Sequence, residues 1–152
     1  MNLVYNEIIR SLAENNISYY LFNESEYDSF MKIVDNNFIN YENENYSFLW
    51  EKINKANRES ISLVNGWKYS CDFTTRFRDV LLFLDPIEDT KLIIKLNSED
   101  LCTLLEDTFS FVYYLSNEEC TFLMCFNDHD YLIVSGISTQ FIKDVKNNLE
   151  VS

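Results

Sequence analysis

The chain has 152 residues, 47% hydrophobic and 16% aromatic, so it can bury a core of ordinary size as a single domain over residues 1–152. Its 25 acidic and 12 basic residues give a net charge of −13, which argues against binding to nucleic acid or to an anionic membrane surface. The aromatic content also excludes a disordered acidic tail, because such tails contain few aromatic residues.

The sequence shows no targeting segment, cofactor motif or metal motif. Its N-terminus lacks the basic start and apolar run of a signal peptide, and no stretch reaches the roughly 20 apolar residues of a membrane span, which predicts a cytoplasmic protein. Gly66 and Gly136 are too far apart to form a phosphate-binding loop. We therefore predict no cofactor.

Four cysteines, Cys71, Cys102, Cys120 and Cys125, are predicted to be buried thiols. Disulfides are rare in the cytoplasm, which leaves metal binding as the alternative. Cys120 and Cys125 are five residues apart in a predicted strand, and an odd separation places their side chains on opposite faces. They are therefore poorly placed to share a metal ion, and we predict no metal site.

Apolar residues at helical spacing predict three helices in the N-terminal part of the chain. The three stripes are Tyr5, Ile8 and Leu12, then Tyr27, Phe30, Met31 and Val34, and then Tyr46, Leu49, Trp50 and Ile53. Ser25, followed three residues later by Asp28, is typical of an N-terminal cap for the second helix. Residues 17–22 predict a short strand, and residues 40–45 predict a loop.

From residue 78 onward the pattern predicts strands. Residues 80–84 are apolar on both faces, which is typical of a central strand covered on each side. Further strands are predicted at residues 91–96, 109–115, 121–126 and 131–134, and helices after Ser98 and from Ser138 or Thr139. Short connections predict antiparallel hairpins. The expected fold is α+β, a single antiparallel sheet of about five strands with helices packed on it and a mainly helical N-terminal part.

The negative charge is concentrated. Twelve carboxylates and only two lysines lie between Asp79 and Asp130, so this segment carries −10 of the net charge. The acidic residues fall mainly in predicted turns, where they would be exposed to a partner. The predicted partner-binding residues are Asp85, Glu88, Asp89, Glu118, Glu119, Asp128, His129 and Asp130, with Glu42 and Glu44 as a second acidic loop.

Catalysis is the weaker interpretation. His129 is the only histidine, and Cys125, four residues earlier, could supply the thiolate of a Cys–His pair. The residues around His129 are also those expected in a polar hairpin turn, where Asp and Asn are common and His is tolerated. Acidic pairs for a glycosidase are expected by chance among 25 carboxylates. We therefore predict no catalytic residue.

The sequence also gives expectations for the burial of four aromatic residues. Trp50 is expected in the core, and Trp67 is equally compatible with the core and the surface. Tyr113 and Tyr114 are adjacent in a predicted strand, so one of the two rings is expected to be exposed to solvent.

The small size, acidity and low glycine content of the chain resemble those of bacterial immunity proteins, which neutralise the toxins of contact-dependent growth inhibition and related systems. Residues 77–84 and 127–136 look similar to segments of such proteins. This resemblance implies a cytoplasmic inhibitor of a cognate toxin, and a basic nuclease fits the acidity of the chain. A regulatory or adaptor module that binds a basic protein, and an enzyme, remain the alternatives. The sequence leaves the oligomeric state open.

Overall fold

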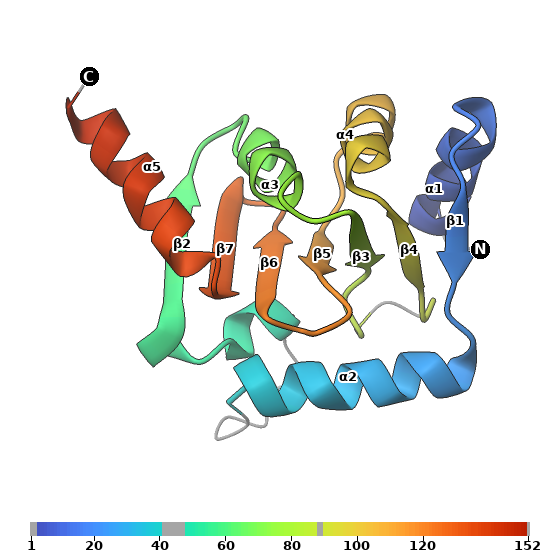
Figure 1. Cartoon of the computed structure of the whole chain (residues 1–152), viewed down its shortest axis with the longest axis horizontal. Helices are drawn as coiled ribbons and strands as arrows, with labels where there is room; N and C mark the ends of the chain where they lie inside the picture. Colours follow the sequence, from blue (N-terminus) through green and yellow to red (C-terminus); the bar gives the residue numbers. More distant parts are fainter. Residues whose placement is uncertain (1–2, 41–47, 88–89, 152) are drawn as a thin grey trace.

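The computed structural model describes residues 3–40, 48–87 and 90–151 and is drawn in Figure 1. In this part of the chain five α-helices flank one sheet: α1 (Leu3–Glu14), α2 (Glu24–Phe38), α3 (Trp67–Thr74), α4 (Ser98–Asp107) and α5 (Thr139–Val151). The strands are β1 (Tyr19–Leu21), β2 (Arg58–Ser62), β3 (Asp79–Phe83), β4 (Ile93–Asn97), β5 (Tyr113–Ser116), β6 (Phe122–Phe126) and β7 (Tyr131–Gly136). Two 3₁₀ turns, η1 (Leu49–Lys52) and η2 (Lys55–Asn57), precede β2.

The sheet has seven strands in the order β1-β4-β3-β5-β6-β7-β2, and every described pair is antiparallel. The antiparallel register decides which loops share an end of the sheet. The end at which β3 begins, called here the Asp79 end, also holds the turn between β5 and β6. The opposite end, called the Asp85 end, holds the turn between β6 and β7, the segment before β5 and the segment after β2.

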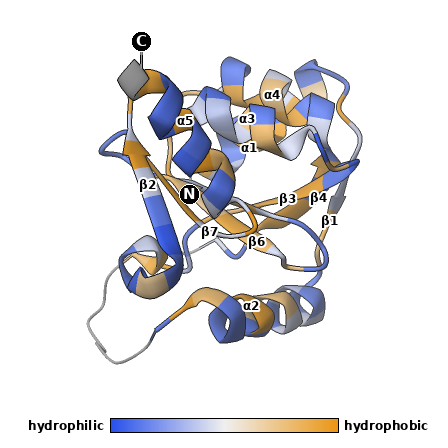
Figure 2. Ribbon diagram, turned by 60° about the vertical axis from the view of Figure 1, so that its left-hand side comes forward, coloured by the Kyte–Doolittle hydropathy of each residue, from blue (hydrophilic) through white to orange (hydrophobic). Residues whose placement is uncertain are grey.

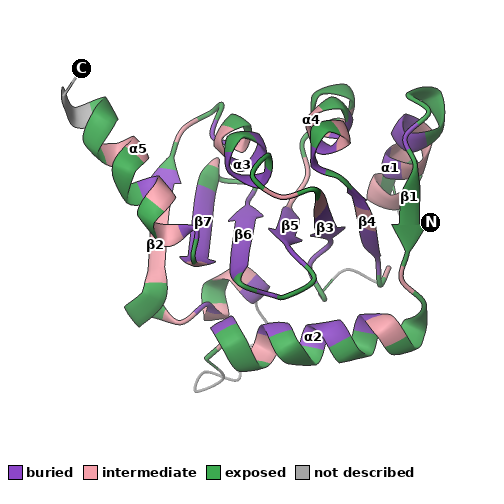
Figure 3. Ribbon diagram, in the orientation of Figure 1, coloured by how far each residue is buried: buried purple, intermediate pink, exposed green. Residues whose placement is uncertain are grey.

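Helices cover both faces of the sheet (Figure 2). On one face, α1, α3, α4 and α5 pack through Leu12, Phe73, Leu101 and Ile142, among other residues. On the other face, α2 and η1 pack against a second apolar cluster that includes Val34. Most residues of β3 to β7 are therefore buried (Figure 3), whereas β1 forms an exposed edge strand. No helix in the described part of the chain has the length and apolarity to cross a membrane.

The strand prediction for residues 80–84 is confirmed. Alternate side chains of β3 enter the two clusters, Val80 and Leu82 on one face and Leu81 and Phe83 on the other. The prediction of two later hairpins is also confirmed, because β5–β6 and β6–β7 are antiparallel neighbours. The α+β class and the single antiparallel sheet hold, but the sheet contains seven strands rather than about five.

The N-terminal part is less helical than predicted. The third apolar stripe forms 3₁₀ turns instead of an α-helix, and its first member, Tyr46, lies outside the described residues. The N–H groups at the start of η1 make tertiary contacts: Leu49 N–H donates to Asp85, and Trp50 N–H donates to the Tyr114 hydroxyl. Strand β2 and helix α3 follow, and neither is predicted by the sequence.

Three boundaries differ from the prediction. Asn23 rather than Ser25 caps α2, because Asn23 and Glu26 form a reciprocal capping box. Asn97 rather than Ser98 caps α4 by accepting a hydrogen bond from Glu99 N–H. Residues 109–112 do not belong to β5, which begins at Tyr113.

Asp85 joins η1 to the sheet. It is 2% exposed, and its carboxylate accepts hydrogen bonds from Leu49 N–H (2.9 Å), Ile87 N–H (3.0 Å) and the Tyr114 hydroxyl. The same hydroxyl accepts from Trp50 N–H at 2.9 Å. Burial, together with the neighbouring Cys125 and Asp85, raises the pKa of Tyr114, so the phenol remains a donor to Asp85.

We expect Asp85→Ala to lower the free energy of unfolding by roughly 2–4 kcal/mol, because it leaves buried donors without an acceptor. Tyr114→Phe removes one hydroxyl and should cost about 1–2 kcal/mol. Urea unfolding measures both changes. Asp128→Ala, at an exposed carboxylate, is the control and should change stability by less than about 0.5 kcal/mol. An Asp85→Ala protein as stable as this control would contradict the assigned role.

Candidate functional site

The structure separates the predicted partner-binding residues. Asp128, His129 and Asp130 lie together in the turn between β6 and β7, at the Asp85 end. Glu118 and Glu119 lie in the turn between β5 and β6, at the opposite end, where Glu118 forms a 2.5 Å salt bridge with Lys95. The predicted residues Glu88 and Asp89, and the second acidic loop with Glu42 and Glu44, lie outside the described residues. The described acidic turns therefore do not form one patch.

Asp85 requires a correction. The sequence pattern places it in an exposed turn, but the structure buries it beneath η1, where all its described partners belong to the protein itself. Asp107 is also engaged internally: it accepts hydrogen bonds from Ser11 and Asn15, which lower the pKa of its carboxyl, and it pairs with Arg10 at 3.3 Å. Asp85 is therefore withheld from a partner by burial, whereas Asp107 stays exposed but is paired within the protein.

The turn between β6 and β7 is held by Asn127. Its buried side chain accepts hydrogen bonds from the backbone N–H groups of His129 (2.9 Å) and Tyr131 (3.0 Å). Asp130 adopts a left-handed conformation (φ 61°), which Asp tolerates better than most residues. The backbone carbonyl of Asp130 accepts a hydrogen bond from Leu63 N–H just after β2. The acidic turn is thus fixed from both sides by hydrogen bonds within the protein.

His129 does not form the Cys–His pair that the sequence left open. Its side chain is 67% exposed, and its ring meets Trp50 edge-to-face with the centroids 6.5 Å apart. Cys125 is wholly buried in the core, and desolvation raises the pKa of its thiol, which opposes formation of a thiolate nucleophile. Trp50, expected in the core, is half-buried and packs against the cluster on the α2 face, with Phe48 stacked on its ring.

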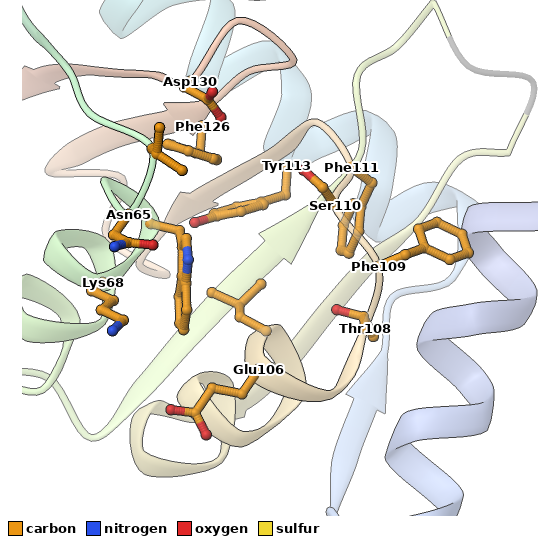
Figure 4. Close-up of a pocket in the computed structure, with 13 residues that line it drawn as sticks. Asn65, Lys68, Glu106, Thr108, Phe109, Ser110, Phe111, Tyr113, Phe126 and Asp130 are labelled. Atoms are coloured by element: carbon orange, nitrogen blue, oxygen red, sulfur yellow. The ribbon is translucent and has the colours of Figure 1, made fainter.

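A second feature of the Asp85 end is an open cavity of about 620 Å³, shown in Figure 4. Its aromatic lining residues are Trp67, Phe109, Phe111, Tyr113 and Phe126, and its charged ones are Lys68, Glu106 and Asp130. We call it the aromatic groove. It brings together the start of α3, the end of α4, the segment before β5 and the turn between β6 and β7.

The groove has a buried lining and a polar border. Tyr113 and Phe126 are almost wholly buried, and the Tyr113 hydroxyl lies 2.9 Å from the Ser70 hydroxyl. Burial raises the pKa of Tyr113. In the view of Figure 4, Asp130 and Glu106 lie at opposite borders of the cavity, and Lys68 lies on a third side. The Lys68 ammonium is 5.8 Å from the centroid of the Trp67 ring.

The sequence pattern did not reveal this groove. The sequence predicts a strand at residues 109–115, which places Phe109 and Phe111 in the sheet rather than in a groove wall. The expectation that one ring of Tyr113 and Tyr114 lies outside is wrong, because both faces of β5 are covered. Trp67, between Gly66 and a polar run, and Tyr113, one of the Tyr113–Tyr114 pair, are the aromatic residues at this place that the sequence offers as candidates for binding.

The predicted buried thiols are found for Cys71, Cys120 and Cys125, while Cys102 is partly buried. Cys120 and Cys125 pack in the same cluster, contrary to the prediction, because Cys120 lies in a turn (φ 55°) rather than in the strand. Within the described ranges, no three His, Cys, Asp or Glu side chains are grouped so that they could hold a metal ion.

Comparison of the chain with protein-family models, with curated proteins and with solved structures finds no match.

We expect Asn127→Ala to lower the free energy of unfolding by roughly 1–3 kcal/mol, because two turn N–H groups lose their acceptor. The amide protons of His129 and Tyr131 should exchange faster with solvent, while those of the turn between β5 and β6 stay unchanged. Native-state hydrogen exchange measures this difference. Equal acceleration in both turns would show that Asn127 stabilises the fold generally and does not shape this turn.

Proposed function

We propose that this protein is an acidic immunity protein that binds and neutralises a basic bacterial toxin in the cytoplasm, with a nuclease as the toxin class that best fits the charge. It acts by binding and not by catalysis. The proposal rests on one observation: an exposed acidic turn and an aromatic groove lie next to each other at the Asp85 end of the sheet. Aromatic anchors surrounded by a polar rim are typical of protein-binding surfaces.

The electrostatics support a basic partner. Among the described residues, carboxylates paired with lysine or arginine are those of Glu7, Glu14, Glu59, Asp107 and Glu118. Asp128 and Asp130 are not among them, and the Asp128 side chain is 57% exposed. With a net charge of −13, the protein repels other acidic molecules and attracts basic ones, which raises the rate of association with a basic partner.

The geometry supports the turn between β6 and β7 as the centre of the contact. His129 at this turn meets Trp50 on the α2 side of the sheet, and Asp130 borders the aromatic groove on the α3 and α4 side. A partner placed against this end would therefore meet charge and aromatic surface together. Glu118 and Glu119 lie at the other end and take no part in this contact.

A small regulatory or adaptor module that binds a basic protein would use the same surface. The two functions differ in the outcome for the partner, because only an inhibitor abolishes a toxic activity. Co-expression with the product of the neighbouring upstream reading frame separates them. Restored growth supports the inhibitor, and binding without rescue supports the adaptor.

We expect the double substitution Asp128→Lys and Asp130→Lys to slow association with the cognate toxin by about tenfold at low salt, with a smaller effect as salt screens the charges. The matched control is Glu118→Lys with Glu119→Lys, which changes the net charge equally at the opposite end. Stopped-flow association over a range of ionic strength measures both. Equal slowing by the two variants would show that only net charge matters and would remove the Asp85 end from the contact.

A further inference from the structure

We infer that the aromatic groove is the binding site for an arginine side chain of a protein partner, with Asp130 as the carboxylate that receives the guanidinium. The inference deepens the proposed function, on which it rests for the identity of the partner. Three features of the described residues lead to it: the aromatic lining, the charges at the border and the rigidity of the turn that carries Asp130.

The aromatic lining suits a cation. The π-face of tryptophan attracts ammonium and guanidinium groups within about 6 Å of the ring centroid. The protein already uses this property, because the Lys68 ammonium lies 5.8 Å from the Trp67 centroid. Phe111 and Phe126 extend the apolar surface, so the methylene groups of a long cationic side chain would also be covered.

The border of the groove is negative. Asp130 and Glu106 line it, against Lys68 as the single cation among its described residues. No salt bridge within the described ranges joins Asp130 or Glu106 to a lysine or arginine. A guanidinium entering beside Asp130 would gain charge-assisted hydrogen bonds from its carboxylate, and next to apolar rings these are less weakened by water. Glu106, at the opposite border, adds to the negative potential of the groove.

Asp130 is held in advance, which reduces the entropy cost of binding. Its backbone N–H donates to the Asn127 carbonyl, its carbonyl accepts from Leu63 N–H, and the Asn127 side chain fixes the residues on either side. The groove volume of about 620 Å³ lies within the range of ligand sites, roughly 300–1,000 Å³, and exceeds the need of one side chain. It therefore also has room for the neighbouring residues of the partner.

Arginine fits these features better than lysine. Its guanidinium is planar, so it can stack on an aromatic ring while its edge donates two parallel hydrogen bonds to one carboxylate. It is also more weakly hydrated than an ammonium group, and entering an apolar groove costs it less. Arginine is, in addition, a residue by which basic proteins contact phosphate, so an inhibitor that captures it competes directly with a phosphate-bearing substrate.

The test uses the complete protein and two small probes, N-acetyl-arginine amide and N-acetyl-citrulline amide, which differ by the guanidinium charge. Two-dimensional NMR titration should show the arginine probe shifting resonances of Trp67, Phe111 and Asp130, with at least tenfold weaker binding of the citrulline probe. Equal binding of both probes, or shifts confined to other residues, would overturn the inference.

The carboxylate is tested with Asp130→Asn, since asparagine keeps the left-handed backbone conformation of the turn. This variant should bind the arginine probe at least threefold more weakly, while Glu119→Asn, in the other acidic turn, should bind it as the unaltered protein does. Unchanged resonances away from the groove verify folding. Equal binding by both variants would exclude Asp130 as the receiving carboxylate.

The two proposals fail differently. If the arginine probe binds the groove but no basic toxin is bound, the groove inference stands and the proposed function falls. The double variant Trp67→Phe with Asp130→Asn separates the opposite case. If this variant and the unaltered protein bind a toxin with equal affinity, the proposed function stands and the groove inference falls.

Discussion

The burial of the central strands on both faces is the constraint from which the rest of this structure follows. β3, β5 and β6 carry apolar side chains toward α2 on one side and toward α1, α3, α4 and α5 on the other. A sheet enclosed in this way has no polar face for recognition, so the charged groups are displaced to its ends and to the outer surfaces of its helices. The acidic turns and the aromatic groove lie at those ends for this reason.

Asp85 is the exception to that displacement. The first N–H groups of a helical turn have no acceptor within the turn, and at the start of η1 the Asp85 carboxylate and the Tyr114 hydroxyl supply acceptors to Leu49 and Trp50. The interaction fixes η1, and with it Trp50, beside the turn that carries His129. A residue that resembles a surface charge in the sequence thus holds together the end of the sheet that we assign to partner binding.

Secondary structure was predictable wherever one periodicity dominated. The stripe of Ile8 and Leu12 gave α1, and the uninterrupted apolar run at residues 80–84 gave a strand covered on both sides. Prediction failed where distant residues decide the backbone. β2 buries only Ile61 and is a strand because it pairs with β7, and η1 depends on Asp85. Residues 109–111 lie outside the sheet and line the groove. Of the predicted site residues, Asp128, His129 and Asp130 lie together beside the groove, whereas the others are buried, distant or outside the described residues.

The sequence alone determined the net charge of −13, which follows from composition. It also determined the α+β class and the approximate order of helices and strands, because these follow from the spacing of apolar residues along short stretches of chain. Only the tertiary structure decided which acidic turns share an end, that Asp85 faces inward and that aromatic residues from three separate segments line one groove. Those features depend on strand register and on contacts between residues far apart in the chain. A one-residue shift in register would turn every side chain of a strand to the opposite face of the sheet.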